Sequence, residues 1–294
     1  MRSAPNEKWT IVRLIEWSAG FLEQKGIESA RLNVELLMCS VLRCDRVTLY
    51  LNFDRPLEQD ELSNFKKRLL RRASREPLQY IVGETEFFSL RFQVGPGVLI
   101  PRPETEVLVE RAISYLSLSN QKSNVLDVGT GSGIIAISIA KHCPAAHLLA
   151  IDISDTALQV AAENSKLHNT SERIELIQCN ILNEQDWHLL GDVKFDVIVS
   201  NPPYIASSER NTLEPEVRQY EPAEALFVEE PLLFYRVLGQ LAKRFLSKQG
   251  QLLCEIAANR HAAIASLFGE MALQKIEVLP DLTGKMRVIT ATIP

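Results

Sequence analysis

The sequence predicts an α/β protein in which a mostly parallel sheet is covered by helices on both faces, preceded by a small helical bundle and a β-hairpin. Apolar residues recur at helical spacing from Thr10 to about Arg75, and the period changes to two between about Tyr80 and Ile100. After Pro103, short apolar strands alternate with amphipathic helices. We therefore expect an N-terminal helical domain (1–78), a hairpin connector (79–102) and an α/β domain (103–294).

Length and composition fit an ordinary globular protein. The 294 residues are 46% hydrophobic and 23% charged, so the chain can bury a large core without a disulfide or metal. The five cysteines form no C-x-x-C pair, and the five histidines show no metal-ligand spacing. No apolar run approaches the roughly 18 residues that span a bilayer, and residues 1–8 contain no apolar signal core. We expect a cytoplasmic protein with no metal site and no membrane association.

Three helices are expected in the N-terminal part. Thr10 can cap the first, which ends at Gly26; Ser29 begins a second, and Pro56 opens a third. The third helix ends in a basic run, Lys66–Arg75. Such runs usually form a solvated face, and the alternative is a contact surface for an acidic protein or for RNA.

Strand signals fill the rest of the chain. Alternating Phe87, Leu90, Phe92 and Val94 predict the hairpin, with a turn at Pro96-Gly97. Apolar runs then predict the seven strands of the sheet, which are Asn124–Val128, His147–Ile151, Ile174–Gln178, Phe195–Ser200, Gln251–Ile256, Ile276–Leu279 and Val288–Ile293.

A glycine-rich turn follows the first of these strands. It reads Gly129-Thr130-Gly131-Ser132-Gly133, directly after an acidic strand end and before an apolar helix. Glycines at such a turn let backbone N–H groups approach a ligand closely. Gly133 comes one residue too early for the dinucleotide fingerprint G-x-G-x-x-G, although the loop alone leaves an NAD site possible. The spacing resembles the first motif of class I S-adenosylmethionine methyltransferases.

Two further positions extend the predicted cofactor site. Asp152 ends the next strand about twenty residues after the glycines, where a carboxylate can accept both ribose hydroxyl protons of an adenosine. Its alternative role is a helix cap, shared with Ser154. Asn180 and Ile181 follow the third strand, where these methyltransferases often place an Asp against the adenine amine. The Asn180 amide oxygen can still accept a proton there.

The tetrapeptide Asn201-Pro202-Pro203-Tyr204 follows the fourth strand. Ligands of open α/β sheets bind outside the carboxyl ends of the strands, so this tetrapeptide should face the glycine loop and border the cofactor at Asn201. The two prolines fix the backbone and remove two N–H donors. The acceptors that remain, the Asn201 side-chain oxygen and the Pro202 carbonyl, suit a planar NH2 group. A rigid turn after a buried strand is the other interpretation.

These acceptors address a specific chemical problem. An amide nitrogen shares its lone pair with its carbonyl and is a poor nucleophile, and acceptors that hold both N–H bonds favour a pyramidal nitrogen. The other contribution is alignment of the nitrogen with the methyl group for an in-line displacement, because positioning alone lowers a reaction barrier by about 7–11 kcal/mol. We expect Asn201, Pro202 and Tyr204 to be catalytic. Pro203 would complete the substrate site, and the Tyr204 ring would pack against the flat target group.

Two more stretches, Arg75–Gly83 and Val98–Glu106, support a family resemblance. With the motifs above they resemble the release-factor glutamine methyltransferase family over nearly the whole chain. The resemblance implies that S-adenosylmethionine is the methyl donor and S-adenosylhomocysteine the product. It implies methylation of N5 of the Gly-Gly-Gln glutamine in bacterial class I peptide chain release factors, in support of translation termination, with the helical domain docking that protein. It also places the Pro101–Thr105 loop near the methionine end of the cofactor. We expect a monomer.

Three alternatives remain at this point. Nucleic-acid amino methyltransferases share the tetrapeptide, but a net charge of -5 and few aromatics speak against a nucleic-acid substrate, while the Lys66–Arg75 run keeps one open. Glutamine methyltransferases of ribosomal proteins also share it, and the Pro101–Glu106 loop favours the release-factor group over them. A non-catalytic module with the same fold is disfavoured by the intact glycine loop, Asp152 and acceptor pair.

Overall fold

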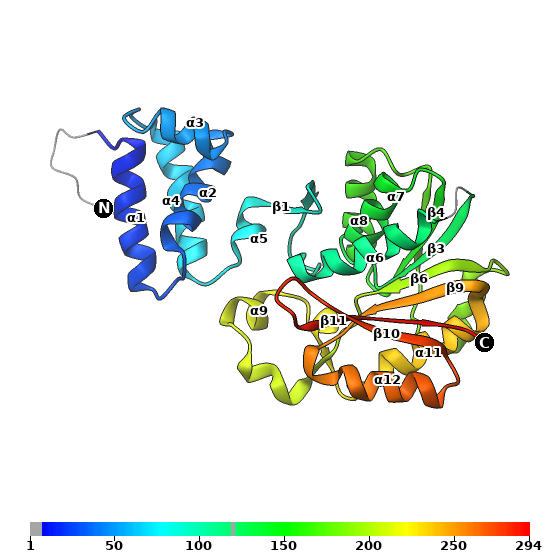
Figure 1. The fold of residues 1–294 in the computed structure, drawn as a ribbon. Coiled ribbons are helices and arrows are strands. Elements are labelled where there is room, and N and C mark those ends of the chain that lie inside the picture. The colour runs from blue at the N-terminus through cyan, green and yellow to red at the C-terminus, as the bar shows by residue number, and fades with distance from the viewer. Residues whose placement is uncertain (1–7, 119–120) are drawn as a thin grey trace. The chain divides into compact units, whose positions relative to one another are not determined.

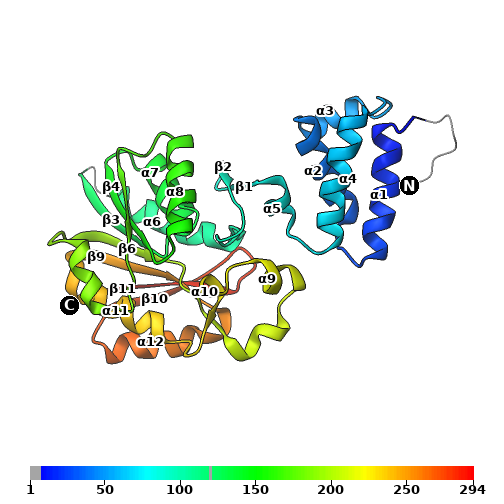
Figure 2. The same ribbon diagram turned by 180° about the vertical axis from the view of Figure 1, so that it is seen from behind.

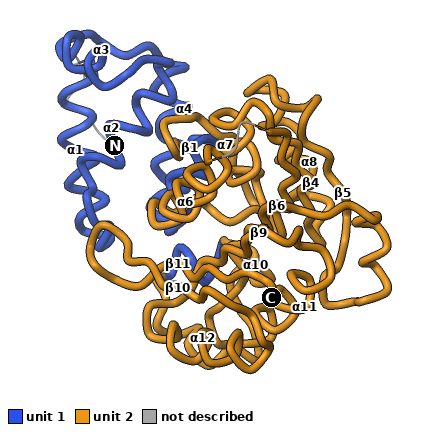
Figure 3. The backbone as a smooth tube through the Cα atoms, turned by 45° about the vertical axis from the view of Figure 1, so that its right-hand side comes forward, with its two compact units in different colours: residues 1–84, 215–220 blue, residues 85–214, 221–294 orange. Residues whose placement is uncertain are grey.

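In a computed structural model, which describes residues 8–118 and 121–294, the chain divides into two compact units (Figure 3). Unit 1 is Met1–Glu84 together with Pro215–Tyr220, and unit 2 is Thr85–Glu214 with Glu221–Pro294. By backbone packing, the boundary of the helical unit lies after Glu84, and the distant segment Pro215–Tyr220 belongs to the same unit. The predicted three-part division stays a prediction. Residues 1–7, where we expect no signal core, lie outside the described part.

Unit 1 is helical, as predicted. Its apolar centre includes Leu14, Val34 and Phe65, each fully buried. Asp45 caps a short helix that the sequence did not predict, accepting a hydrogen bond from Thr48 N at 2.7 Å. The helices are α1 (Ile11–Gln24), α2 (Ala30–Leu42), α3 (Arg46–Leu51), α4 (Gln59–Ala73), α5 (Leu78–Val82) and α9 (Pro215–Tyr220).

Two predicted helix starts differ in detail. Thr10 stands at the N-cap of α1, but its side chain makes no capping hydrogen bond. The third helix begins after Glu58 instead of at Pro56, because Glu61 reaches back and accepts from Glu58 N at 2.8 Å. Pro56 instead pairs with Thr10 in an isolated antiparallel bridge.

The interpretation of the basic run as a solvated face holds for its exposed residues Lys66, Lys67 and Arg71, and is wrong for the buried Arg72. Arg72 is buried and donates to the Asn33 Oδ1, the Glu76 carbonyl and Glu216 Oε1, at 2.7, 3.0 and 2.9 Å. Arg75 donates to the carbonyls of Lys25 and Gly26, at the end of α1, at 2.9 Å each. Lys66 and Lys67 are exposed. The run is therefore mainly a set of links within unit 1, with Arg68 bonded to Ser40 and Ile81 and Arg71 to Glu76.

Unit 2 is built on the predicted seven-stranded sheet, in the order β10-β11-β9-β6-β3-β4-β5 (Figure 1). Only β11 runs antiparallel to its neighbours. β9 begins earlier than predicted, because the polar residues 247–250 form an irregularity between its pairings Phe195↔Leu246 and Val197↔Gln251. The strands are β3 (Ser123–Val128), β4 (Ala146–Asp152), β5 (Ile174–Gln178), β6 (Phe195–Ser200), β9 (Leu246–Glu255), β10 (Gln274–Pro280) and β11 (Met286–Thr292).

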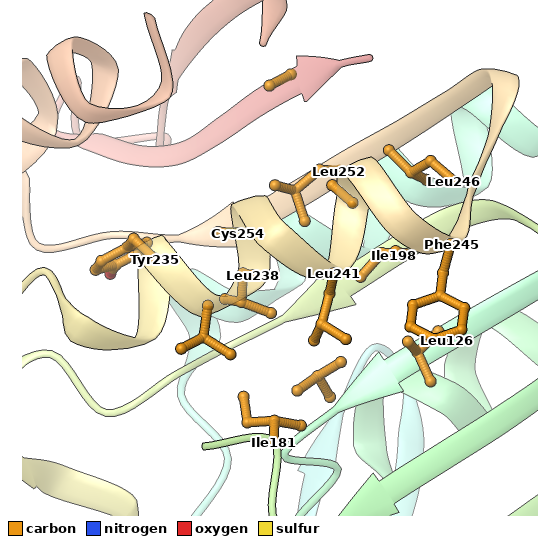
Figure 4. Packing of buried hydrophobic residues seen from close by; sticks show 14 of the residues in the cluster. Leu126, Ile181, Ile198, Tyr235, Leu238, Leu241, Phe245, Leu246, Leu252 and Cys254 are labelled. Atoms are coloured by element: carbon orange, nitrogen blue, oxygen red, sulfur yellow. The ribbon is translucent and has the colours of Figure 1, made fainter. Parts of the chain in front are cut away.

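Helices cover both faces of this sheet (Figures 1 and 2). One face packs against α6 (Glu106–Leu116), α7 (Ile134–His142) and α8 (Asp155–Leu167), and the other against α11 (Leu233–Phe245) and α12 (His261–Glu270). Figure 4 shows Leu238 and Leu241 of α11 facing Ile198 and Leu252 of the sheet, with Tyr235 at the start of the same helix. Strands buried on both faces explain the continuous apolar runs in the sequence.

The hairpin consists of β1 (Glu84–Phe87) and β2 (Leu90–Gln93). Its two-residue turn is Phe88-Ser89, both at positive φ (51° and 58°), as a type I′ connection requires. Pro96-Gly97 forms a separate, later turn. The remaining elements are the short strands β7 (Ile205–Ala206) and β8 (Phe227–Val228), the helix α10 (Ala223–Leu226) and the 3-10 turns Pro103–Thr105, Glu184–Leu190, Ser207–Thr212 and Ala258–Arg260.

Candidate active site

The predicted site residues lie at one edge of the sheet, at the carboxyl ends of four adjacent parallel strands. The glycine loop follows β3, Asp152 ends β4, Asn180 and Ile181 follow β5, and residues 201–204 follow β6. The strand order reverses between β3 and β6, which is where open α/β sheets bind their ligands. Val128 and Ser200, the last residues of these two strands, are register partners. The glycine loop and the tetrapeptide therefore begin side by side.

The glycine loop is held by the neighbouring strand. Gly129 N and Thr130 N donate to the Ile151 carbonyl at 2.8 and 3.0 Å, and Gly131 N donates to Asp152 Oδ2 at 2.9 Å. Gly129 and Gly131 have φ of +73° and +57°. No non-neighbouring heavy atom of the described structure lies within 4 Å of the point where a Cβ would stand on either residue. These two glycines therefore border open space.

Gly133, at φ +82°, serves a different purpose. A Cβ there would lie 3.2 Å from Ala161 Cβ and 3.3 Å from Ala161 Cα, so α8 packs directly against this glycine. Asn164, buried one turn further along α8, donates to the Ser132 carbonyl at 2.9 Å. The third glycine thus fixes the loop against a helix.

A buried acid lies beneath the loop. Asp127 is fully buried, and its Oδ2 accepts from Thr130 Oγ1 at 2.7 Å and from Ala136 N at 3.2 Å. Its Oδ1 is buried with no hydrogen-bond partner among the described residues. Burial, together with the neighbouring Asp152 carboxylate, raises the pKa of Asp127 to about 7. An orphaned carboxylate oxygen at this place offers an acceptor to a ligand.

The helix-cap role that was the alternative for Asp152 belongs to Ser154. Ser154 caps α8 by accepting from Ala157 N at 3.2 Å. Asp152 instead accepts from Ser154 N and Gly131 N, at 2.9 Å each, and burial raises its pKa. These hydrogen bonds hold the Asp152 carboxylate in place beside the glycine loop. Its contact with a ribose stays a prediction.

Asn180 and Ile181 are held in a turn after β5. Asn180 Oδ1 accepts from Leu182 N at 3.1 Å, so one of its two lone pairs is already used. Ile181 is buried, and its carbonyl accepts from Trp187 Nε1 at 2.9 Å. A contact between Asn180 and an adenine also stays a prediction.

The tetrapeptide is connected to two residues that we did not select from the sequence. Asn201 Nδ2 donates to Thr105 Oγ1 at 3.2 Å, and Thr105 Oγ1 donates to Glu255 Oε2 at 2.6 Å. The Tyr204 hydroxyl donates to Glu255 Oε1 at 3.3 Å, while its ring packs against the apolar cluster under α11. Burial raises the pKa of Glu255 to about 7. A carboxylate within the otherwise apolar run Leu252–Ile256 is the signal that could have drawn attention to it.

The loop before Thr105 is held by a second buried acid. Glu221 accepts from Ile100 N at 3.2 Å and from Arg102 Nη2 at 2.5 Å. Glu106, at the other end of the loop, accepts from Phe88 N at 2.8 Å. The resembling stretch Val98–Glu106 is thus fixed in place beside the tetrapeptide.

Some kinds of site were not found in the part of the chain that the structure describes. No group of three or more His, Cys, Asp or Glu side chains there could hold a metal ion. No described helix is long and apolar enough to cross a membrane.

Comparison with known proteins identifies the family. A model described as the PrmC N-terminal domain matches residues 13–83, and one described as the methyltransferase small domain matches residues 105–217. A protein of Geobacter sulfurreducens, named release factor glutamine methyltransferase, is 40% identical over 98% of this chain and 98% of its own length. This chain belongs to the release factor glutamine methyltransferase family.

Two further proteins with related names are similar to this chain. The Chlorobaculum tepidum release factor glutamine methyltransferase is 40% identical over 94% of this chain and 95% of its own length. A solved release factor-specific protein-(glutamine-N5) methyltransferase of Alicyclobacillus acidocaldarius is 32% identical, with a TM-score of 0.42, over 69% of this chain and 100% of that one. The assignment rests on the sequence relatives. The predictions of the family, of the methyltransferase class and of the fold are confirmed.

Proposed function

We propose that this protein transfers a methyl group from S-adenosylmethionine to N5 of the Gly-Gly-Gln glutamine of class I peptide chain release factors. The observation that carries the proposal is the acceptor pair at the end of β6, Asn201 and Pro202, beside the glycine loop at the end of β3. The names of the relatives supply the class of substrate. The N–CH3 bond forms as the S–CH3 bond breaks, so S-adenosylhomocysteine is the second product, and the methylated nitrogen then loses one proton to water.

The residues of the glycine loop fit the cofactor. Open space borders Gly129 and Gly131, and a Cβ on either would fill it. The unpaired Asp127 Oδ1 and the fixed Asp152 carboxylate offer acceptors for the ammonium and hydroxyl groups of such a ligand. When bound, S-adenosylmethionine supplies an activated methyl group. The residues that would hold it are Gly129, Thr130, Gly131, Ser132, Gly133, Asp152, Asn180 and Ile181, and Asn201 would border it without contributing much to its binding.

The tetrapeptide binds and orients the glutamine amide. Asn201 Oδ1 and the Pro202 carbonyl accept hydrogen bonds from its two N–H groups, and their placement favours a pyramidal nitrogen and fixes the direction of its lone pair. Pro202 and Pro203 have no N–H, so this edge presents acceptors without competing backbone donors. Positioning of this kind contributes about 7–11 kcal/mol. Tyr204 has its hydroxyl bonded to Glu255, so it offers the substrate only its ring.

The remaining expectations follow from this substrate. We expect the helical unit to dock the release factor, the enzyme to act as a monomer, and the compartment to be the cytoplasm, where translation ends. The arginines of the basic run are largely occupied within unit 1, and the net charge is -5. Both features disfavour a nucleic-acid substrate.

The test is a methyl-transfer assay with labelled S-adenosylmethionine and purified class I release factor. The control substrate is the same factor with its Gly-Gly-Gln glutamine replaced by alanine. We expect label on the first and none on the second. Transfer to RNA or DNA instead would overturn the choice of substrate.

Asn201→Ala tests the acceptor pair in the same assay. We expect turnover to fall by about 100-fold or more, the usual effect of deleting one preorganised polar contact at a reacting group. The dissociation constant of S-adenosylmethionine should change by less than about threefold. Unchanged turnover would remove Asn201 from the proposed machinery.

A further inference from the structure

We infer that Thr105 and Glu255 are positioning residues, which fix the Asn201 amide so that its oxygen, and not its NH2 group, faces the substrate. This inference rests on the proposed function, because it concerns the orientation of the acceptor that the proposal assigns to Asn201. It adds two residues, from the loop before α6 and from the end of β9, to the tetrapeptide.

The geometry is a chain of hydrogen bonds leading inward from the tetrapeptide. Asn201 Nδ2 lies 3.2 Å from Thr105 Oγ1, and Thr105 Oγ1 lies 2.6 Å from Glu255 Oε2. Thr105 and Glu255 are both buried, at 0% and 1% exposure. Asn201 is only partly buried, so it is the member of the chain that reaches the ligand-binding edge.

The direction of each bond follows from the chemistry of the groups. An ionised carboxylate can only accept, so the single proton of the Thr105 hydroxyl is donated to Glu255. The Thr105 oxygen can then only accept from its other neighbour, Asn201, so Asn201 must act as the donor. Asn201 can donate only through Nδ2. Its Oδ1 must then point away from Thr105, toward the edge where a ligand would bind.

An amide lacks this preference on its own. The oxygen and nitrogen of an Asn side chain are nearly equal in size, and a half-turn about the last bond exchanges them. A reversed Asn201 would present two donors to the donor NH2 group of glutamine. Thr105 and Glu255 therefore decide whether the end of β6 attracts or repels the proposed substrate.

Glu255 is itself held rigidly. Its second oxygen accepts from the Tyr204 hydroxyl at 3.3 Å, and its backbone carbonyl accepts from the Tyr235 hydroxyl of α11 at 2.9 Å. The charged groups that face it are Arg287 of β11, which favours the ionised form, and Glu104, which opposes it. Burial raises the pKa of Glu255 to about 7.

This environment makes the orientation depend on pH. Protonated Glu255 can donate to Thr105 Oγ1, which frees the threonine proton and permits the reversed amide. We therefore expect the turnover number at saturating S-adenosylmethionine to fall as the pH drops below about 7.

The experiment compares Thr105→Val, which keeps the shape but removes the hydroxyl, with Thr105→Ser, which restores it. Thr290→Val is the matched control, because Thr290 is fully buried and its Oγ1 has no partner among the described residues. We expect Thr105→Val to lower kcat on the order of 100-fold, as small misplacements of reacting groups do. Thr105→Ser and Thr290→Val should stay within about threefold of wild type. The dissociation constant of S-adenosylmethionine should be unchanged in all three.

Two further measurements separate orientation from packing. Glu255→Gln should abolish the decline of kcat below about pH 7, since glutamine does not titrate. In the Asn201→Ala background, Thr105→Val should have no further effect on kcat. Full activity of Thr105→Val, or equal losses in Thr105→Val and Thr105→Ser, would overturn the inference.

A readout without turnover keeps this test independent of the substrate assignment. The side-chain NH2 signals of Asn201, assigned by their loss in Asn201→Asp, should show slowed hydrogen exchange in the wild type. Thr105→Ser should retain that slowed exchange. Glu255→Gln should change the exchange rate, and it tests the same hydrogen-bond chain if Thr105→Val does not fold. Fast exchange in the wild type would refute the bond to Thr105. Protected exchange in a protein that fails to methylate release factor would refute the proposed substrate alone.

Discussion

Replacing Gly133 by alanine should destabilise unit 2, whereas replacing Gly131 should mainly impair cofactor binding. The two residues belong to the same loop, and both have positive φ, +82° and +57°. They differ in what a new methyl group would meet. Next to Gly133 it would press on α8, and next to Gly131 it would enter open space.

The sizes of the two effects follow from these surroundings. A left-handed conformation disfavours alanine by about 1–2 kcal/mol at either position. At Gly133, contacts of 3.2 and 3.3 Å with Ala161 Cβ and Cα require α8 to move, and overpacking of this kind adds about 1–3 kcal/mol. We expect Gly133→Ala to lose about 3 kcal/mol of unfolding free energy and Gly131→Ala about 1 kcal/mol.

Cofactor affinity should show the opposite ranking. The Cβ of Gly131→Ala would occupy the space that the proposal assigns to S-adenosylmethionine, so we expect the dissociation constant to rise at least about tenfold, or about 1.4 kcal/mol. Gly133→Ala should change it less, provided the protein is kept below its unfolding temperature.

Urea unfolding and calorimetric titration with S-adenosylmethionine measure the two quantities. Gly284→Ala is a suitable control, because Gly284 has φ +83° with open space around it and lies in the turn between β10 and β11, away from the loop. It should show the conformational loss alone. Equal destabilisation by Gly131→Ala and Gly133→Ala, or an unchanged affinity in Gly131→Ala, would refute this reasoning.

Three further predictions concern other parts of the protein. Asp152→Ala should weaken S-adenosylmethionine binding in the titration while Asn201→Ala does not, and an unaltered dissociation constant would remove Asp152 from the site. The pKa of Glu255 is raised from its ordinary 4.5 to about 7, so the stability that Glu255 contributes is present below pH 4.5 and lost as the pH rises through 7. Urea unfolding should therefore show that Glu255→Gln gains about 3 kcal/mol relative to wild type between pH 4 and pH 8. A difference that stays constant with pH would contradict the raised pKa. Arg72→Met should lower the unfolding free energy of unit 1 by about 3 kcal/mol, because it leaves Asn33 and Glu216 without their buried partner. Arg71→Met should cost less than about 1 kcal/mol, because Arg71 pairs with Glu76 at the surface. Fluorescence of Trp9 and Trp17 in a Trp187→Phe background reports the unfolding of unit 1, and equal effects of the two substitutions would argue against the buried network.

The sheet could be predicted from the sequence because its strands are buried on both faces. Val125–Val128 and Val197–Val199, with 2% exposure or less at their apolar residues, appear in the sequence as short apolar runs between helical patterns. The loops after these strands were identified from residue types alone, since glycines permit backbone conformations that other residues avoid and prolines restrict the backbone. Local chemistry was sufficient for the strands of the sheet and for the edge at which the predicted site residues lie.

Contacts between distant residues were not predictable in this way. Thr105 lies 96 residues from Asn201 and 150 from Glu255, and no periodicity relates them. The burial of Arg72 was missed for the same reason, because its partners lie on α2 and α9, at Asn33 and Glu216. The short helix α3 has too few residues for a helical period to emerge.

The presence of residues 215–220 in unit 1 affects how the protein can be made. A ribosome that has completed Glu84 has not yet produced Glu216, the carboxylate that Arg72 and Arg75 contact at 2.9 and 3.4 Å. The helical unit therefore cannot reach its final arrangement until more than 130 further residues, including strands β3 to β6, have been synthesised. A fragment ending at Glu84 would carry a buried guanidinium without its counter-charge. Isolated helical units of this protein should accordingly include a peptide spanning α9.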